Sequence, residues 1–258
     1  MKTTKLLAAS SICLWRSAID MGLRLRKKAI NRAIVIDFEG AGRSHDGTAP
    51  PPILLGVLSG GAYRAYFLHD RFTRRWVRAA RAAGPERMAT ASLHSVVSSL
   101  VEQAERENRV ILHFSRHEPG MLETYIQDKA LITRLRAVLA DGKPLMVRAA
   151  AKRQCKPPAA KDLKTLAGIL VPNIQAQQTK VDVGGITRSL EKSSARGNWK
   201  DAELLKLSKL LEYNRLDLEI LQQGAREARG IRGPRKLAVT RPDSAKHDFQ
   251  RAAVDPDP

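Results

Sequence analysis

The stretch AIVIDFEGAG, residues 33–42, decides the fold, because four apolar residues run directly into two carboxylates. Isoleucine and valine suit a covered, pleated surface, so residues 33–36 predict a buried β-strand. Side chains alternate between the two faces of a strand, and Asp37 and Glu39 therefore project to the same face. Two adjacent carboxylates repel each other and are costly to bury unless protons or metal cations lie between them. The alternative is a strand that simply ends in solvent at Asp37.

The segments that follow predict an α/β domain with a mixed sheet flanked by helices. Residues 53–58 and 62–68 flank Ser59-Gly60-Gly61 and predict a β-hairpin. Residues 109–115 predict a further short strand. Helical spacing of apolar residues predicts helices over residues 71–83, 92–108, 116–140, 161–170 and 201–228. Residues 116–140 should break near Pro119-Gly120, and the basic, weakly periodic residues 141–161 should form a loop or a partly covered strand.

Residues 201–228 give the strongest helical pattern, with Asp201 placed to cap the start and Gly230 beyond the end. The polar, proline-bearing residues that follow predict disorder. We therefore expect a basic extension over residues 1–27, a folded domain over 28–226 and a disordered tail over 227–258. The first residues have a basic start and a short apolar run without a clear cleavage site, so we expect no secretory signal.

Tyr213 and Asp217 lie four residues apart and therefore share one helix face, together with Leu210 and Ile220. A carboxylate on such a face is buried and needs a partner. The carboxylates of the first strand could provide one only through a cation. The alternative is that Asp217 lies at the edge of the apolar stripe and pairs with Arg215 or another arginine.

Charge is the strongest compositional signal, because 258 residues carry a formal net charge of +19. Such an excess attracts polyanions, of which nucleic acid is the usual one, although an anionic membrane surface or a ribosome-like scaffold also fits. No stretch approaches the length of a transmembrane helix, so we expect no membrane partner. Cys13 and Cys155 are isolated, which argues against a disulfide framework and a structural zinc site. A reducing, cytoplasmic location follows as an expectation.

Four arginines, Arg71, Arg74, Arg75 and Arg78, fall on one face of the helix expected over residues 71–83. Such a stripe can follow a phosphate backbone, so we expect these arginines to bind nucleic acid. The alternative is an ordinary solvated helix face. The interleaved aromatic residues Phe72 and Trp76 are expected to pack inward.

The D-x-E at the end of the first strand, the three-strand meander and the Y-x-x-x-D on a late helix resemble the DEDD exonucleases of the RNase H-like superfamily. The tyrosine is similar to that of the DEDDy branch, and the layout of RVILHFSRHEPGMLETY, KDLKTLAGIL and the last helix most resembles bacterial predicted RNase H-like nucleases. The resemblance covers residues 34–223. It implies an RNase H-like fold and 3′–5′ exonuclease activity on single-stranded DNA or RNA.

The resemblance also implies two divalent cations, Mg²⁺ or Mn²⁺, that hold the scissile phosphate. Asp37 would bridge both ions, Glu39 and Asp217 would complete the site of the nucleophilic water, and Tyr213 would orient that water. The family places an aspartate after the fourth strand, whereas this sequence offers Glu118, which we take as the fourth metal ligand. Asp128 and Asp162 are weaker substitutes, and we expect His113 and His117 to be packing or surface residues.

Two other functions remain open. The first is a nucleic-acid-binding protein on the same fold whose catalytic site has decayed at Glu118. The second is a basic scaffold or interaction protein without nuclease ancestry. That second reading gains if the strand ending near Asp37 and the helix carrying Asp217 are not neighbours.

Overall fold

The computed structural model describes residues 25–40, 52–70, 74–84, 88–171 and 181–231. Six strands occur in these ranges: β1 (Ile34–Glu39), β2 (Leu54–Ser59), β3 (Ala62–Leu68), β4 (Ala89–Ala91), β5 (Ile111–His113) and β6 (Leu139–Asp141). The helices are α2 (Lys27–Asn31), α3 (Arg74–Ala82), α4 (Leu93–Arg106), α5 (His117–Tyr125), α6 (Lys129–Val138), α7 (Lys143–Gln154), α8 (Leu163–Leu170), α9 (Val183–Ser193), the 3-10 turn η1 (Ser194–Arg196) and α10 (Asp201–Ala228).

The strands form one mixed sheet in the order β4-β3-β2-β1-β5-β6. Strands β1, β2 and β3 form an antiparallel meander. On the other side of β1, β5 and β6 run parallel to it, and β4 adds a short parallel strand beside β3. This α/β arrangement agrees with the RNase H-like fold expected from the sequence. Because β1, β5 and β6 are parallel, their carboxyl ends meet at one edge of the sheet, where ligands commonly bind in open α/β sheets.

The hairpin between β2 and β3 is confirmed with its turn at the expected glycines. Gly60 and Gly61 have φ angles of 61° and 85°. Positive φ at both central residues is the geometry of a two-residue hairpin turn that matches the twist of its strands, and glycine adopts it at no steric cost.

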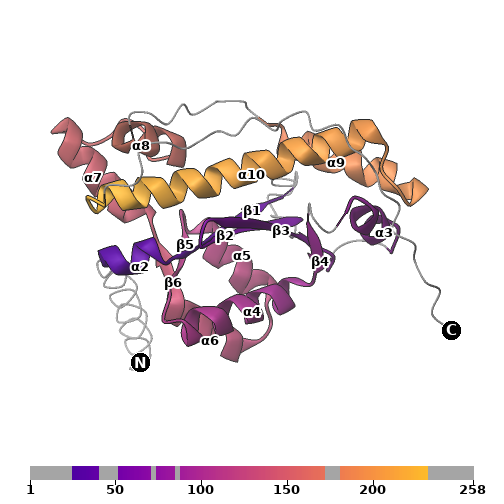
Figure 1. Ribbon diagram of the computed structural model, residues 1–258, viewed down its shortest axis with the longest axis horizontal. Coiled ribbons are helices and arrows are strands. Elements are labelled where there is room, and N and C mark those ends of the chain that lie inside the picture. The colour runs from indigo at the N-terminus through magenta and orange to yellow at the C-terminus, as the bar shows by residue number, and fades with distance from the viewer. Residues whose placement is uncertain (1–24, 41–51, 71–73, 85–87, 172–180, 232–258) are drawn as a thin grey trace, which may run out of the picture.

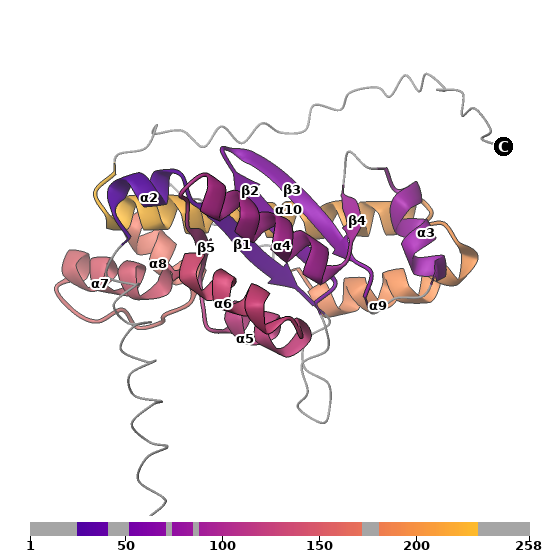
Figure 2. The same ribbon diagram turned by 90° about the horizontal axis from the view of Figure 1, so that it is seen from below.

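Helices cover both faces of the sheet (Figures 1 and 2). Ile34, Ile36 and Phe38 of β1 pack into a core with α4, α5 and α6. The alternate residue Val35 faces the opposite core, which is built with α7, α8 and α10. Alternation therefore turns Asp37 and Glu39 toward α10 rather than toward α4.

Helix α10 crosses the sheet on the face that carries these carboxylates (Figure 1). Its buried residues recur at helical spacing: Leu207, Leu210, Leu211, Asn214, Leu218, Ile220, Leu221, Gly224 and Ala225. The cap is one residue earlier than the sequence indicated, because Lys200 is the N-cap and Glu203 accepts a hydrogen bond from its backbone N–H at 3.0 Å. Gly230 follows the helix end with φ of 65°, as expected.

Two expectations about the middle of the chain are wrong. Residues 141–161 were expected to form a loop or a partly covered strand, but they contain helix α7. Pro144 does not prevent this helix, because it lies at the helix start, where proline is tolerated. The break within residues 116–140 lies between α5 and α6, and Pro119 occupies the first turn of α5. There Asp128 starts α6 by accepting a hydrogen bond from the N–H of Leu131 at 3.0 Å.

None of the helices in the described ranges combines the length and the apolar composition that crossing a membrane requires. The expectations for most of the basic extension and of the tail, and for Arg71, Phe72 and Cys13, lie outside the described residues.

Candidate metal centre

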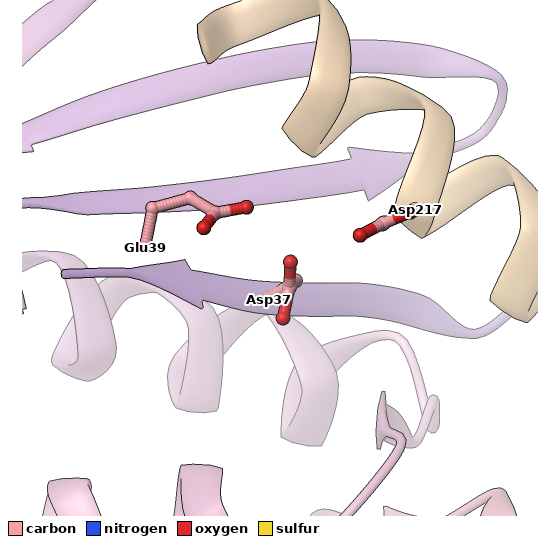
Figure 3. Close-up of side chains that lie close together, drawn as sticks. All are labelled: Asp37, Glu39 and Asp217. Atoms are coloured by element: carbon pink, nitrogen blue, oxygen red, sulfur yellow. The ribbon is translucent and has the colours of Figure 1, made fainter. Parts of the chain in front are cut away.

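Asp37 and Glu39 of β1 meet Asp217 of α10, although Glu39 and Asp217 lie 178 positions apart in the sequence. Each of the three carboxyl groups offers an oxygen that lies within 4.8 Å of the oxygens of the other two. Figure 3 shows the carboxyl groups turned toward one another in the space between β1 and α10. Strand β1 and helix α10 are therefore neighbours. The scaffold alternative would have gained support if they had been apart.

Burial makes this cluster electrostatically unusual. Glu39 is 8% exposed and the Asp217 side chain 14% exposed. Burial, and then the charges of Glu39, Glu118 and Asp217, raise the pKa of Asp37 well above its ordinary value. Burial likewise raises the pKa of Glu39 to about 7 and the pKa of Asp217 above its ordinary range. Three ionised carboxylates in this space need a compensating cation or protons.

The donor set fits a hard divalent cation. Carboxylate oxygens are the ligands that Mg²⁺ and Mn²⁺ prefer, and these three converge from two rigid elements. Within the described residues, the buried Oδ1 of Asp217 accepts no well-aligned hydrogen bond, although Lys164 Nζ forms an ion pair with it at 3.4 Å. A bound cation would satisfy that oxygen and relieve the repulsion among the three groups.

Asn214 lies between the carboxylates and was not identified from the sequence. Its Nδ2 donates to Asp37 Oδ2 at 3.1 Å and to Glu39 Oε1 at 3.3 Å. The Tyr63 hydroxyl donates to Asn214 Oδ1 at 3.1 Å, which fixes the amide with its donors toward the carboxylates. Asn214 is fully buried, and its hydrogen bonds hold both carboxyl groups in place. A polar residue on the otherwise apolar stripe of α10 was the sequence signal that could have revealed it.

Gly56 of β2 makes room for this amide. Gly56 pairs with Asp37 in the register between β1 and β2. A Cβ atom at this position would lie 1.7 Å from Asn214 Oδ1 and 3.0 Å from Leu218 Cδ1. Helix α10 can therefore approach the sheet closely enough to bring Asp217 to β1 only because β2 has no side chain there.

Tyr213 of α10 and Lys164 of α8 lie beside Asp217 in the acidic cluster. Burial and the Asp217 carboxylate raise the pKa of Tyr213 above its ordinary value, so its phenol stays protonated at neutral pH. Lys164 Nζ lies 3.4 Å from Asp217 Oδ1 and 4.3 Å from the centre of the Tyr213 ring. The cation beside Asp217 is thus a lysine from α8, and not Arg215, which pairs with Glu212 and Glu219.

Asp37, Glu39 and Asp217 form an acidic triad, and Glu118 lies near this triad but is not one of its members. It is 6% exposed, and it accepts hydrogen bonds from the N–H and the hydroxyl of Ser115 at 3.1 and 3.0 Å. Burial would raise the pKa of Glu118, but His113 and these donors lower it, so Glu118 carries a charge that acts on Asp37. His113, the packing residue expected, is buried with its Nδ1 3.6 Å from Glu118 Oε2.

The two weaker substitutes for the fourth ligand are helix caps. Asp128 caps α6, and Asp162 caps α8 by accepting a hydrogen bond from the N–H of Thr165 at 2.9 Å. Their carboxylates already have partners at helix starts, where negative charge is favourable. Asp141, at the carboxyl end of β6, pairs with His113 in the sheet and also bonds to the N–H of Lys143 at 2.8 Å.

The basic helix α3 exposes Arg74, Arg75 and Arg78, while Trp76 is buried against Phe67 and Trp199. The inward packing of Trp76 agrees with the expectation from the sequence. In Figures 1 and 2 the carboxyl end of β1 points toward the half of the molecule that holds α3 and α9. The role of the arginines in nucleic-acid binding stays a prediction.

Comparisons with known proteins identify no family: no protein-family model, no curated protein and no solved structure matches this chain.

Proposed function

We propose that this protein is a metal-dependent nuclease that hydrolyses single-stranded nucleic acid from the 3′ end. The observation that carries the proposal is the convergence of Asp37, Glu39 and Asp217 within 4.8 Å in a largely buried site. A strongly basic chain and an RNase H-like sheet agree with it. The resemblance of the D-x-E and Y-x-x-x-D motifs to DEDD exonucleases gives the direction of cleavage.

Asp37, Glu39 and Asp217 would hold Mg²⁺ or Mn²⁺, and the charge of Glu118 would also act on Asp37. When bound, such ions polarise the phosphate and lower the pKa of water. The protonated phenol of Tyr213, beside Asp217, can donate a hydrogen bond that orients the attacking water.

The reaction forms one bond and breaks one. The oxygen of the water attacks phosphorus, and the bond from phosphorus to the 3′ oxygen of the preceding nucleotide breaks. The leaving oxygen takes up a proton and becomes a 3′-hydroxyl, while the water releases one to solvent. The product is a nucleoside 5′-monophosphate.

The test is digestion of a 5′-labelled single-stranded oligonucleotide with Mg²⁺, Mn²⁺ or EDTA. Wild type is compared with Asp37→Asn, Asp217→Asn and Asp201→Asn, which makes the same change at an exposed position of α10. We expect a metal-dependent ladder that shortens from the 3′ end and is lost, by about a thousandfold or more, in the two site variants only.

Binding of the oligonucleotide without cleavage in any metal would favour the second candidate, a binding protein with a decayed site. The position of Glu118 outside the triad is the observation that keeps this candidate in view. Cleavage that survives both site substitutions would contradict the proposed centre.

A further inference from the structure

Lys164 is a cation placed beside the carboxylates by helix α8, which carries none of the proposed metal ligands. It lies in the first turn of α8, which starts at Leu163 and is capped by Asp162. Its Nζ lies 3.4 Å from Asp217 Oδ1, and its side chain is 28% exposed. Lys164 thus reaches the acidic cluster while keeping part of its surface toward solvent.

The position of Lys164 is unfavourable for α8 itself. The amino-terminal end of a helix carries a partial positive charge, which favours anions and disfavours cations in the first turn. The interactions that compensate lie outside α8: the Asp217 carboxylate and the Tyr213 ring, whose centre is 4.3 Å from Nζ. The single positive charge of Lys164 also cannot neutralise Asp37, Glu39 and Asp217 together, because these three carboxyl groups converge beside it.

We propose that Lys164 is a phosphate-binding residue of this site, which neutralises Asp217 while no metal is bound and turns to the phosphate of the substrate when metal is present. This inference rests on the proposed function for the nature of the substrate. Metal and lysine would then compete for the same carboxylate, since both are cations drawn to Asp217. Once a metal holds Asp217, the ammonium group is free to pair with the anion that enters the site.

The competition gives a signature that an ordinary structural ion pair lacks. Lys164→Met should bind Mn²⁺ more tightly, by about tenfold, because a positive charge has been removed from the metal's surroundings. In the presence of saturating Mn²⁺, the same variant should bind a nucleoside 5′-monophosphate about tenfold more weakly, because the anion has lost a partner. If Lys164 were only a structural partner of Asp217, its replacement with methionine would weaken the binding of both Mn²⁺ and the monophosphate.

The experiment is isothermal titration calorimetry of Mn²⁺ into the metal-free full chain, followed by titration of thymidine 5′-monophosphate into the Mn²⁺-loaded protein. Lys161→Met, an exposed lysine of the same segment, is the matched control and should behave as wild type. Lys164→Arg, which keeps the charge, should restore most of the affinity for the monophosphate.

Tighter Mn²⁺ binding together with weaker monophosphate binding supports the inference. Weaker Mn²⁺ binding, or unchanged monophosphate binding, in Lys164→Met overturns it. These readouts do not depend on cleavage. If wild type and the lysine variants bind Mn²⁺ and the monophosphate as expected but wild type degrades no oligonucleotide, the proposed nuclease activity fails. Phosphate binding by Lys164 then still stands.

Discussion

At Asn214 a neutral amide lies between two carboxylates that repel each other. Its two N–H groups donate to Asp37 and Glu39, and its oxygen accepts from the Tyr63 hydroxyl. Hydrogen bonds to charged groups are stronger than those between neutral groups, and a buried carboxylate without donors would pay its full desolvation cost. The amide therefore makes the acidic cluster compatible with folding before any metal binds.

Replacing Asn214 with leucine should lower the free energy of unfolding of the metal-free protein by about 3 kcal/mol, since both carboxylates lose a donor. The same substitution should cost about 1 kcal/mol less in a Glu39→Met background, where one of the acceptors is already absent. Urea denaturation of the four proteins in EDTA measures this coupling. Strictly additive effects would mean that Asn214 contributes packing and nothing specific to the carboxylates.

At the same scale, the sequence predicted the triad but not what surrounds it. Asp37, Glu39 and Asp217 follow from two short patterns, because strand and helix periodicity assign a side chain to a face. Asn214 and Lys164 depend on which helix packs above which strand, and periodicity within one element carries no such information. Glu118 was predicted as the fourth ligand; it lies in the first turn of α5, outside the group formed by Asp37, Glu39 and Asp217, and its role as a ligand stays a prediction.

Among the elements, segments with a clear apolar pattern were predictable from the sequence, and segments without one were not. The β2–β3 hairpin, α4, α8 and α10 match their patterns closely. The strands β4 and β6 have three residues each, too few for an alternating pattern to appear. Helix α7 buries only Leu145, Met146 and Ala150 among its basic residues, so its apolar face is narrow.

The close approach of β2 and α10 makes the stability of the protein depend on the absence of a side chain at position 56. Gly56→Ala should lower the free energy of unfolding by about 2 kcal/mol, because the new methyl group collides with a fully buried amide that cannot move aside. It should also weaken Mn²⁺ binding, since Asn214 and Asp217 are carried on the helix that is pushed away.

The matched control for this substitution is Gly168→Ala. Gly168 lies inside α8, and a Cβ atom there would meet nothing within 4 Å. Alanine is the better helix former by about 1 kcal/mol, so this variant should be as stable as wild type or more stable. Equal stability of the two variants, measured by urea denaturation, would contradict the steric role of Gly56.

In the whole molecule, the fold gathers acidic side chains at one sheet edge of a strongly basic protein. The carboxyl ends of the parallel strands β1, β5 and β6 lie at the same edge, where His113 pairs with Asp141 and β1 continues past the end of β5 to Asp37 and Glu39. Helix α10 adds Asp217 from above. The chain thus concentrates negative charge, at a cost in folding free energy, in the place where a cation would remove that cost.

This cost should appear in the pH dependence of stability. Burial raises the pKa of Glu39 from its ordinary value near 4.5 to about 7, so between these pH values the folded protein binds a proton that the unfolded chain has released. Stability therefore falls as pH rises through this window, and the loss is complete above about pH 7. The raised pKa values of Asp37 and Asp217 act in the same direction.

In EDTA, we expect the free energy of unfolding of wild type to fall between pH 5 and pH 8 by on the order of 3 kcal/mol more than that of Glu39→Gln, which has no proton to lose at this position. Glu212→Gln, an exposed change on α10, should follow wild type. In the proposed metal centre Mg²⁺ would bind the ionised carboxylates, so the stability that it adds should grow with pH over the same window. Parallel pH profiles of wild type and Glu39→Gln in EDTA would show that Glu39 is ionised throughout and that its charge is compensated without metal. A steeper profile for wild type and Glu212→Gln than for Glu39→Gln, abolished by Mg²⁺, would mean that the folded protein keeps its carboxyl groups in an arrangement that a cation stabilises.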